Sequence, residues 1–281
     1  MGFAPTAPPR AGLTEGAGSM TEERFIGYFR LIDACDASGC PVCRCVVRES
    51  RSHLDALLYE QVTDPDTRRA IRASWGFCNW HTWMLREIEQ SIFGSAIIYE
   101  DLVRLALKRT QHLSDRMARP ARSGWLAALL GRRRARAPVD SYRQRAVCPA
   151  CRNIADAETR YVGTLVGFIN EGDLRAAYAR SDGLCVPHLF AAVEGNEEVP
   201  EARVLVDETR AKWSRLGEEL GSFIAKHDYR NREAYTEAEA ASTTRAFEVL
   251  VGAQGVFGND VHARTLEPEG ATQRLLRESV P

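Results

Sequence analysis

A pattern of closely spaced cysteines and histidines occurs twice in this chain and constrains its fold more than any other feature. The first half carries Cys-Pro-x-Cys at residues 40–43 and Cys-x-x-His at residues 78–81. The second half repeats both motifs at residues 148–151 and 185–188, with nearly the same interval between them. Each half therefore offers three sulfurs and one imidazole in two close pairs, which is the ligand set of a tetrahedral Cys3His metal site.

These motifs predict eight metal ligands, four in each half of the chain. The first predicted site consists of Cys40, Cys43, Cys78 and His81, and the second consists of Cys148, Cys151, Cys185 and His188. Residues three positions apart lie on the same side of a helical turn, so each motif directs two ligands the same way. The other explanation, that these cysteines are only small buried apolar residues, does not account for two duplicated pairs.

The two halves of the chain align with each other, which indicates an internal duplication. Aligning Cys40 with Cys148 superposes the two CPxC motifs, and a single-residue deletion further along then aligns Cys78 with Cys185 and superposes the two CxxH motifs. The copies cover roughly residues 25–115 and 140–230. Cys35 and Cys45 align with an arginine and an asparagine in the second copy, so the duplication does not select them as ligands.

The spacing of apolar residues predicts helices throughout both copies, because apolar side chains recur every three or four positions. Pro41 and Pro149 follow the first cysteine of each CPxC motif, where proline suits the opening of a helix. Gly76 and Gly183 are expected to end a helix before each CxxH motif. We therefore predict an all-α protein with two pseudo-repeats of three helices, each stapled by its own Cys3His metal site, and a C-terminal helix.

The chain is expected to divide into six segments. These are a disordered leader (1–19), a first metal-binding repeat (20–117), a basic linker (118–139), a second metal-binding repeat (140–235), a C-terminal helix (236–257) and a disordered tail (258–281). The leader and the tail lack helical periodicity. Met20, directly after the leader, is an alternative start of the chain.

The ligand set alone allows three kinds of chemistry. Four protein ligands fill a tetrahedral site, which favours structural zinc in both sites. An iron–sulfur cluster held by three cysteines and one histidine is the main alternative. Dithiol redox chemistry of the CPxC pairs is another, although the βαβ pattern that usually surrounds a redox CxxC is missing.

The sequence contains no P-loop, no dinucleotide-binding glycine pattern, no GxSxG and no HExxH. The polar segment from His227 to Arg230 is expected to cap and pack a helix end. Because the sequence contains no recognisable set of catalytic residues, we expect a non-enzymatic binding or adaptor module whose partner is another protein.

Positive charge is concentrated between the two copies. Residues 104–145 contain 12 Lys and Arg against 2 Asp and Glu, whereas the whole chain has a net charge of −1. Arg132, Arg133, Arg134 and Arg136 follow a short apolar run. A solvated linker is the simplest interpretation. Phosphate contacts with a nucleic acid and weak association with an anionic membrane surface are the alternatives.

The overall composition, with 44% hydrophobic and 27% charged residues, is typical of a soluble globular protein. No apolar run approaches the ~18 residues of a transmembrane helix, and the N-terminus lacks the apolar stretch of a signal peptide. We therefore expect a cytoplasmic location. In that reducing compartment, cysteine pairs are more often metal ligands or redox thiols than disulfides.

The paired motifs resemble an uncharacterised bacterial family of duplicated Cys/His proteins. The resemblance rests on CPxC with GFCxxH in the first half, CPxC with GLCxPH in the second, and the HDYR segment at residues 227–230. It spans roughly Phe25 to Gly252 and leaves out the arginine-rich linker. What it implies is a mainly helical, cytoplasmic protein of unassigned function, so it supports the ligand assignment and names no activity.

Overall fold

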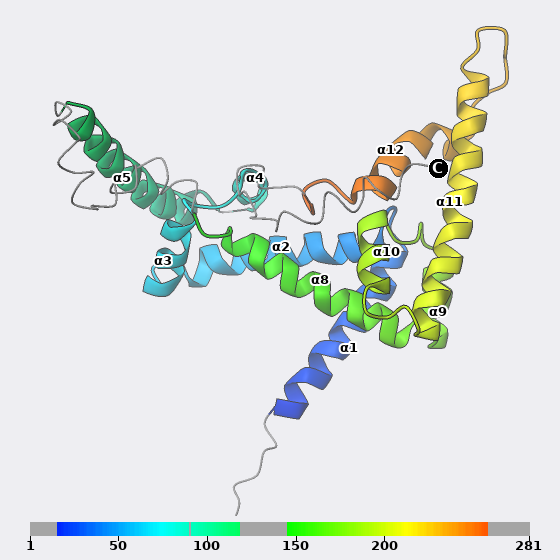
Figure 1. Cartoon of the computed structure of the whole chain (residues 1–281), viewed down its shortest axis with the longest axis horizontal. Helices are drawn as coiled ribbons and strands as arrows, with labels where there is room; N and C mark the ends of the chain where they lie inside the picture. Colours follow the sequence, from blue (N-terminus) through cyan, green and yellow to red (C-terminus); the bar gives the residue numbers. More distant parts are fainter. Residues whose placement is uncertain (1–15, 90, 119–144, 258–281) are drawn as a thin grey trace, which may run out of the picture. The chain divides into compact units, whose positions relative to one another are not determined.

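The computed structural model describes residues 16–89, 91–118 and 145–257 (Figure 1). Within these ranges the chain forms ten α-helices joined by loops, and no β-strand is found. The all-α prediction is therefore confirmed.

The helices repeat in order and in length, as the sequence duplication requires. The first copy contains α2 (Pro41–Glu60), α3 (Pro65–Ala73), α4 (Asn79–Glu87) and α5 (Ser91–Ala118), and the second contains α8 (Pro149–Phe168), α9 (Gly172–Arg180), α10 (Val186–Val193) and α11 (Pro200–Lys226). Helices α2 and α8 have 20 residues each, and α3 and α9 have 9 each. Helices α4 and α10 have 9 and 8 residues, and α5 and α11 have 28 and 27. Helix α1 (Gly16–Cys35) comes before α2, and α12 (Glu237–Val251) is the predicted C-terminal helix.

From its CPxC motif onward, each copy contains four helices, one more than the three predicted. The additional break follows each CxxH helix. Ile88 adopts an extended conformation at the end of α4, and Gly195, with φ of +74°, follows α10. Pro200 then opens α11, where its missing N–H costs no helical hydrogen bond. These breaks make the long helices α5 and α11 separate elements.

The helices form two compact units that cut across the two sequence copies. Unit 1 contains the described residues 16–45 and 158–253, and unit 2 contains the described residues of 46–157 together with 254–257. Helices α2 and α8 each belong to both units, because the N-terminal part of each lies in one unit and the remainder lies in the other. The two CPxC motifs are therefore exchanged between the units relative to the predicted repeat boundaries.

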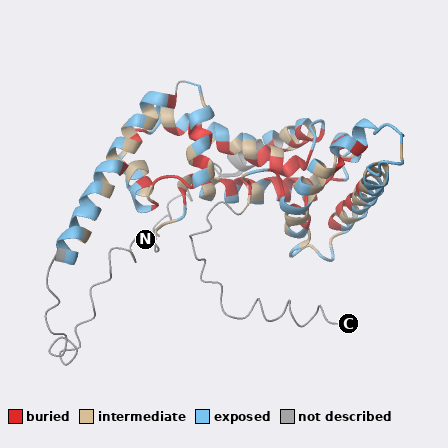
Figure 2. Ribbon diagram, turned by 90° about the horizontal axis from the view of Figure 1, so that it is seen from above, coloured by how far each residue is buried: buried red, intermediate tan, exposed pale blue. Residues whose placement is uncertain are grey.

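Unit 1 is held together by packing between α1 and α9 and among α10, α11 and α12. Its fully buried side chains include Leu165 of α8, Leu174 of α9 and Leu205 of α11. The buried Tyr178 hydroxyl and Thr209 Oγ1 form a hydrogen bond of 2.6 Å, so these polar groups are satisfied inside the core. Figure 2 shows buried and exposed residues alternating along the helices, which is the pattern of amphipathic packing.

Unit 2 has its own hydrophobic core, built from α2, α3, α4, α5 and the start of α8. Its buried members are Leu54, Leu57, Val62, Ile71, Phe77, Cys78, Met84, Leu85, Ile98, Leu102, Cys148 and Ala150. On its surface, Asp101 of α5 pairs with Arg72 at 2.6 Å and with Arg68 at 3.3 Å, which ties α3 to α5. Two of the predicted ligands, Cys78 and Cys148, thus lie within this core.

Gly76 and Gly183 lie just before the CxxH helices of the two units, with φ of +95° and +82°. This left-handed conformation is open to glycine and strained for other residues. The backbone reverses at both positions so that α4 and α10 can begin, as the sequence predicts.

Several predicted features lie outside the described residues. They include Arg132, Arg133, Arg134 and Arg136, the tail from residue 258, and positions 1–15 of the leader. Residues 16–19, which we assigned to the leader, instead belong to α1, and Met20 lies within the same helix. None of the described helices is both long enough and apolar enough to cross a membrane.

Candidate metal centres

The first candidate metal centre, the unit 1 cluster, consists of Cys40, Cys43, Cys185 and His188. Cys40 directly precedes α2, and Cys43 lies in the first turn of that helix. Cys185 is the N-cap of α10 and His188 lies in its first turn. The Cys185 side chain makes no capping hydrogen bond with its own helix. All four residues are buried.

The ligand atoms of the unit 1 cluster surround a common point. His188 Nδ1 lies 3.4 Å from Cys40 Sγ, 3.3 Å from Cys43 Sγ and 3.2 Å from Cys185 Sγ. The Sγ atoms of Cys43 and Cys185 are 3.8 Å apart. Such an arrangement places three sulfurs and one nitrogen where a single ion could bind them all.

The second candidate, the unit 2 cluster, consists of Cys78, His81, Cys148 and Cys151. Cys78 is the N-cap of α4 and Cys148 directly precedes α8, so this cluster also joins the starts of two helices. His81 Nδ1 lies 3.1 Å from Cys78 Sγ, 3.6 Å from Cys148 Sγ and 3.4 Å from Cys151 Sγ. The Sγ atoms of Cys78 and Cys151 are 3.6 Å apart, and Cys151 is partly exposed.

The eight residues selected from the sequence thus fall into the two clusters, but their predicted pairing is wrong. We expected each copy to close its own site. Instead, the CPxC pair of the first copy meets the CxxH pair of the second in unit 1, and the reverse combination forms in unit 2. The physical reason is the division of α2 and α8 between the two units, which carries each CPxC motif away from the CxxH motif of its own copy.

The starts of two helices meet at each cluster, and this favours thiolates. The N–H groups and the positive end of the dipole of each helix point toward the ligand atoms. A divalent ion with three thiolates and one neutral imidazole carries a net charge of −1, which these two helix ends help to balance. The same helical turns therefore supply both the ligand geometry and part of the charge compensation.

In each cluster, hydrogen bonds between the ligands favour a charged pair of one thiolate and one imidazolium. Burial acts to raise the pKa of Cys40, but hydrogen bonds from its neighbouring thiols and His188 lower it well below the usual range. Hydrogen bonds from Cys151 and Cys78 likewise lower the pKa of Cys148. A metal ion that binds either cluster must therefore displace a proton from the imidazole.

The histidine pKa values shift in the opposite direction. Burial acts to lower the pKa of His188, yet its hydrogen bonds, first of all with Cys185, raise it to about 11. For His81, hydrogen bonds led by the one with Cys148 likewise outweigh burial and raise the pKa to about 9. In unit 1 the two other thiols are held protonated, because hydrogen bonds within the cluster raise the pKa of Cys43 and of Cys185.

A family model matches residues 24–255, which include both clusters. It describes a family of unknown function, DUF6062. The chain belongs to DUF6062. This confirms the resemblance to an uncharacterised family, and the DUF6062 match begins within α1 and extends past the end of α12.

A relative of this DUF6062 member is the "uncharacterized 23.9 kDa protein in xynA 3'region" of Caldicellulosiruptor sp. (strain Rt8B.4). The two are 26% identical over 217 residues, which cover 76% of this chain and 96% of the relative. No solved structure matches. The comparisons therefore give a family and a bacterial relative, and the chemistry must be argued from the clusters themselves.

Two contacts support the unit 1 cluster from outside the ligand set. Glu158 Oε1 of α8 lies 3.2 Å from His188 Nε2, the ring nitrogen that faces away from the sulfurs. The Ala253 backbone N–H donates a hydrogen bond of 3.4 Å to Cys43 Sγ. Sequence reasoning missed Glu158. The residue at the same place in the first copy is Ser50, so a search for duplicated residues passes over it.

Cys35 and Cys45 lie outside both clusters, in agreement with the prediction that they are not ligands. Both are buried. Burial raises the pKa of Cys35 to about 12. The Cys45 thiol donates a hydrogen bond of 3.4 Å to the Arg30 carbonyl oxygen. The two thiols therefore serve as small core residues of unit 1.

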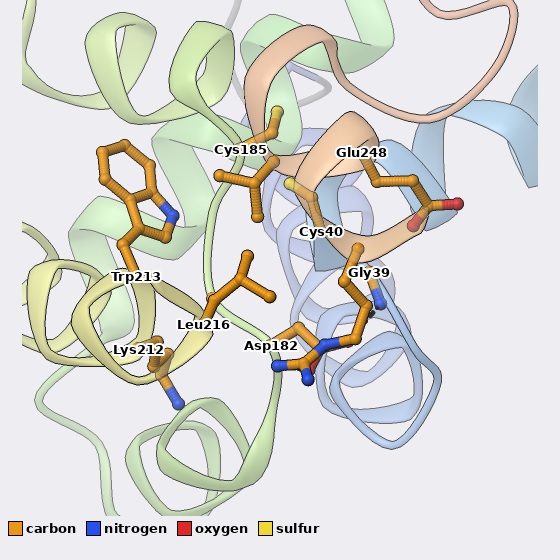
Figure 3. Close-up of a pocket in the computed structure, with 11 residues that line it drawn as sticks. Gly39, Cys40, Asp182, Cys185, Lys212, Trp213, Leu216 and Glu248 are labelled. Carbon is orange, nitrogen blue, oxygen red and sulfur yellow. Dashed lines mark hydrogen bonds and ion pairs between the residues drawn. The ribbon is translucent and has the colours of Figure 1, made fainter. Parts of the chain in front are cut away.

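A small pocket beside the unit 1 cluster is lined by Cys40, Cys185, Trp213, Leu216 and Glu248 among others (Figure 3). The residues around it hold the loop that presents Cys40. The Gly39 N–H donates a hydrogen bond of 2.7 Å to Asp182, and Arg44 pairs with Glu248 at 3.4 Å. Since the first ligand immediately follows Gly39, this network positions Cys40.

The HDYR segment has the capping role expected from the sequence. His227 is the C-cap of α11, and its Nδ1 lies 3.3 Å from the Tyr235 hydroxyl. Asp228 pairs with Arg230 two residues later at 2.7 Å. These are local contacts of a helix end and the loop that follows it.

Proposed function

We propose that this DUF6062 member is a structural zinc protein with two Cys3His sites, and that it acts as a non-enzymatic binding or adaptor module. The observation that carries the zinc proposal is the size of the clusters. With Zn–S bonds of about 2.3 Å and Zn–N bonds of about 2.0–2.1 Å, tetrahedral geometry requires S···S distances of about 3.8 Å and S···N distances of about 3.6 Å. The Sγ atoms of Cys43 and Cys185 lie 3.8 Å apart, those of Cys78 and Cys151 lie 3.6 Å apart, and the S···N distances are 3.1–3.6 Å, which is close to this geometry.

The compactness of the clusters favours one ion over an iron–sulfur cluster. In a multi-iron cluster the protein ligands bind different irons, so their donor atoms stand around several atoms rather than one. Here the four ligand atoms of each group all lie within 4.8 Å of one another. A mononuclear tetrahedral ion is therefore the better fit.

The structural role follows from the closed ligand set and from where the ligands lie. Four protein side chains leave no coordination position for water or substrate, which is the arrangement of structural zinc. Each ion would join helix starts that are far apart in sequence, Cys43 with Cys185 in unit 1 and His81 with Cys148 in unit 2. Its binding free energy would then contribute directly to folding.

Elemental analysis of protein purified without oxygen, together with an absorption spectrum, tests this proposal. We expect two zinc ions per chain, a colourless sample, and loss of helical structure when a strong chelator removes the metal. Fewer than about one zinc per chain, or folding that a strong chelator leaves unchanged, would contradict it. A brown sample with visible absorption would support the iron–sulfur alternative instead.

A further inference from the structure

The two clusters have the same ligands but differ in what holds the histidine. Helices α2 and α8 have 20 residues each and begin at equivalent prolines, so Ser50 and Glu158 occupy the same position in the two helices. In unit 1, Glu158 Oε1 lies 3.2 Å from His188 Nε2. With Nδ1 facing the sulfurs, Nε2 is the ring nitrogen turned toward this carboxylate, and an ion-pair contact at this distance favours the tautomer with hydrogen on Nε2 and one orientation of the ring.

The corresponding nitrogen in unit 2 has no such anchor. His81 Nε2 is buried and has no hydrogen-bond partner among the described residues. Ser50 Oγ and His53 Nε2, both on α2 in the same unit, are also buried without a partner in the described part of the chain. The serine at the Glu158 position is shorter by two carbons. The ring of His81 is therefore held by its contacts with the sulfurs and by packing, without a charged second partner.

The two clusters also differ in how far their ligands are exposed to solvent. All four members of the unit 1 cluster are buried, whereas Cys151 of the unit 2 cluster is partly exposed. In unit 1, the Ala253 N–H also donates to Cys43 Sγ and so stabilises a thiolate there. A competing ligand can reach a sulfur of the unit 2 cluster more directly than any sulfur of the unit 1 cluster.

From these contacts we infer that the two metal ions exchange at different rates, slowly in unit 1 and faster in unit 2, and that Glu158 is the positioning residue responsible for the slow site. This inference rests on the proposed metal binding. Release of an ion begins when one ligand leaves it, and an imidazole held by a carboxylate turns away less readily than one that is not. Unit 2 thus contains the exchangeable metal, and unit 1 the permanent one.

A chelator chase followed by cysteine alkylation and mass spectrometry measures both sites in one sample. We expect Cys78, Cys148 and Cys151 of the full-length wild type to become alkylated at least about tenfold faster than Cys40, Cys43 and Cys185, the size of effect that outer contacts have on metal sites. Glu158→Ser should accelerate release from unit 1 by about tenfold or more and leave unit 2 unchanged.

Two further variants separate positioning from charge and from general destabilisation. Glu158→Gln keeps an oxygen that accepts the same hydrogen, so it should restore most of the slow exchange. Asp156→Ser removes one negative charge from an exposed position on the same helix and should change neither rate. The ¹H–¹⁵N signal of His188 Nε2–H should be protected from exchange with water in the wild type and lose that protection in Glu158→Ser.

The possible outcomes distinguish failure of the inference from failure of the proposed function. Two bound metal ions that leave at equal rates, or faster release from unit 1, would overturn the inference and leave the zinc proposal intact. An equal effect of Glu158→Ser and Asp156→Ser would also overturn it, because charge alone would then explain the rates. A wild type that binds no metal would instead refute the proposed function.

Discussion

The unit 1 and unit 2 clusters are built from the same four residue types, on the starts of matching helices, yet their surroundings differ. In unit 1, Glu158 contacts the outer nitrogen of His188, and the Ala253 N–H donates to a ligand sulfur. In unit 2, the outer nitrogen of His81 has no partner among the described residues, and Cys151 is partly exposed. Duplication has thus kept the ligands of both sites, while the residues that support them have diverged.

This difference separates two properties that a ligand motif alone would combine. The ligands decide whether a metal ion can bind and which geometry it adopts. The surrounding contacts decide how firmly the ligands are held. The two sites have the same ligands but different surrounding contacts. Because both lie in one chain, each site can serve as the reference for measurements on the other.

The largest expected effect comes from removing a ligand from one unit only. Cys43→Ala should abolish metal binding in unit 1, and with it a contribution on the order of 10 kcal/mol to folding. This is comparable with the ~5–15 kcal/mol stability of a typical domain, so unit 1 should unfold. Hydrogen exchange should show lost protection in α10 and α11, with protection retained in α4 and α5 and one metal ion still bound.

Cys45→Ala is the matched control, because Cys45 is also a buried cysteine near the start of α2 and lies outside both clusters. It removes a weak hydrogen bond to the Arg30 carbonyl oxygen and a small side chain. A loss of about 1 kcal/mol is expected, with two metal ions retained. Similar unfolding in both variants would mean that Cys43 acts through core packing rather than through a metal.

Acid should release the metal from unit 1 steeply. In the metal-free cluster near neutral pH, His188 and the thiols of Cys43 and Cys185 hold their protons, because hydrogen bonds in the cluster raise their pKa values, whereas Cys40 is a thiolate. Binding of a metal must therefore displace about three protons, and affinity falls about 1000-fold for each unit by which the pH drops.

The same measurement can compare unit 1 with unit 2, because each cluster consists of three cysteines and one histidine. A metal-competition titration at several pH values should give a slope near three for unit 1 and of at least two for unit 2, where hydrogen bonds in the cluster raise the pKa values of His81 and Cys151. A slope below two in unit 2 would mean that His81, which lacks a second partner among the described residues, is not bound to the ion. Affinity that rises as the pH falls would contradict thiolate ligation altogether.

Smaller effects are expected at the two equivalent turn glycines. A Cβ at residue 183 would lie 2.7 Å from Lys212 Cδ, and a shift of that side chain would disturb the 2.7 Å hydrogen bonds that Lys212 Nζ donates to the carbonyl oxygens of Ala179 and Ser181. At residue 76 the nearest atom is a Leu102 methyl at 3.0 Å.

We expect Gly183→Ala to cost about 2–3 kcal/mol and Gly76→Ala about 1–2 kcal/mol, since both place alanine at positive φ. Urea unfolding of metal-loaded protein, followed by hydrogen exchange to assign each transition to a unit, measures both. Gly163→Ala, in α8 with no atom within 4 Å of the added Cβ, should be neutral or slightly stabilising. Equal costs at residues 76 and 183 would show that backbone strain alone matters.

The helical class, the turn glycines and the eight cluster residues were all predictable from local pattern. Each depends on residues close in sequence: proline after the first cysteine, glycine before the second motif, and pairs three residues apart. The extra break before the long helices was not predicted, because it depends on the conformations of Ile88 and Gly195 rather than on an apolar stripe.

The pairing of the motifs could not be predicted, because both pairings satisfy the same spacing. Joining Cys43 to Cys185 closes a loop about four times longer than joining it to Cys78, which costs only about 1.2 kcal/mol more at about 0.6 kcal/mol per doubling. This difference is small beside the ~10–16 kcal/mol of structural zinc binding. Loop closure therefore does not decide the pairing; it follows how the two parts of α2 and of α8 are divided between the units, and that is not visible in a motif. Glu158 was missed for a related reason, since the repeat replaces it with serine.

The count of metal ions in two combined variants tests the exchanged pairing most directly. The first variant replaces Cys40, Cys43, Cys185 and His188 with alanine, and the second replaces Cys40, Cys43, Cys78 and His81. With exchanged pairing, the first loses one complete site and should retain one metal ion by native mass spectrometry. The second loses half of each site and should retain none. The opposite result, no ion in the first variant and one in the second, would show that each repeat closes its own site.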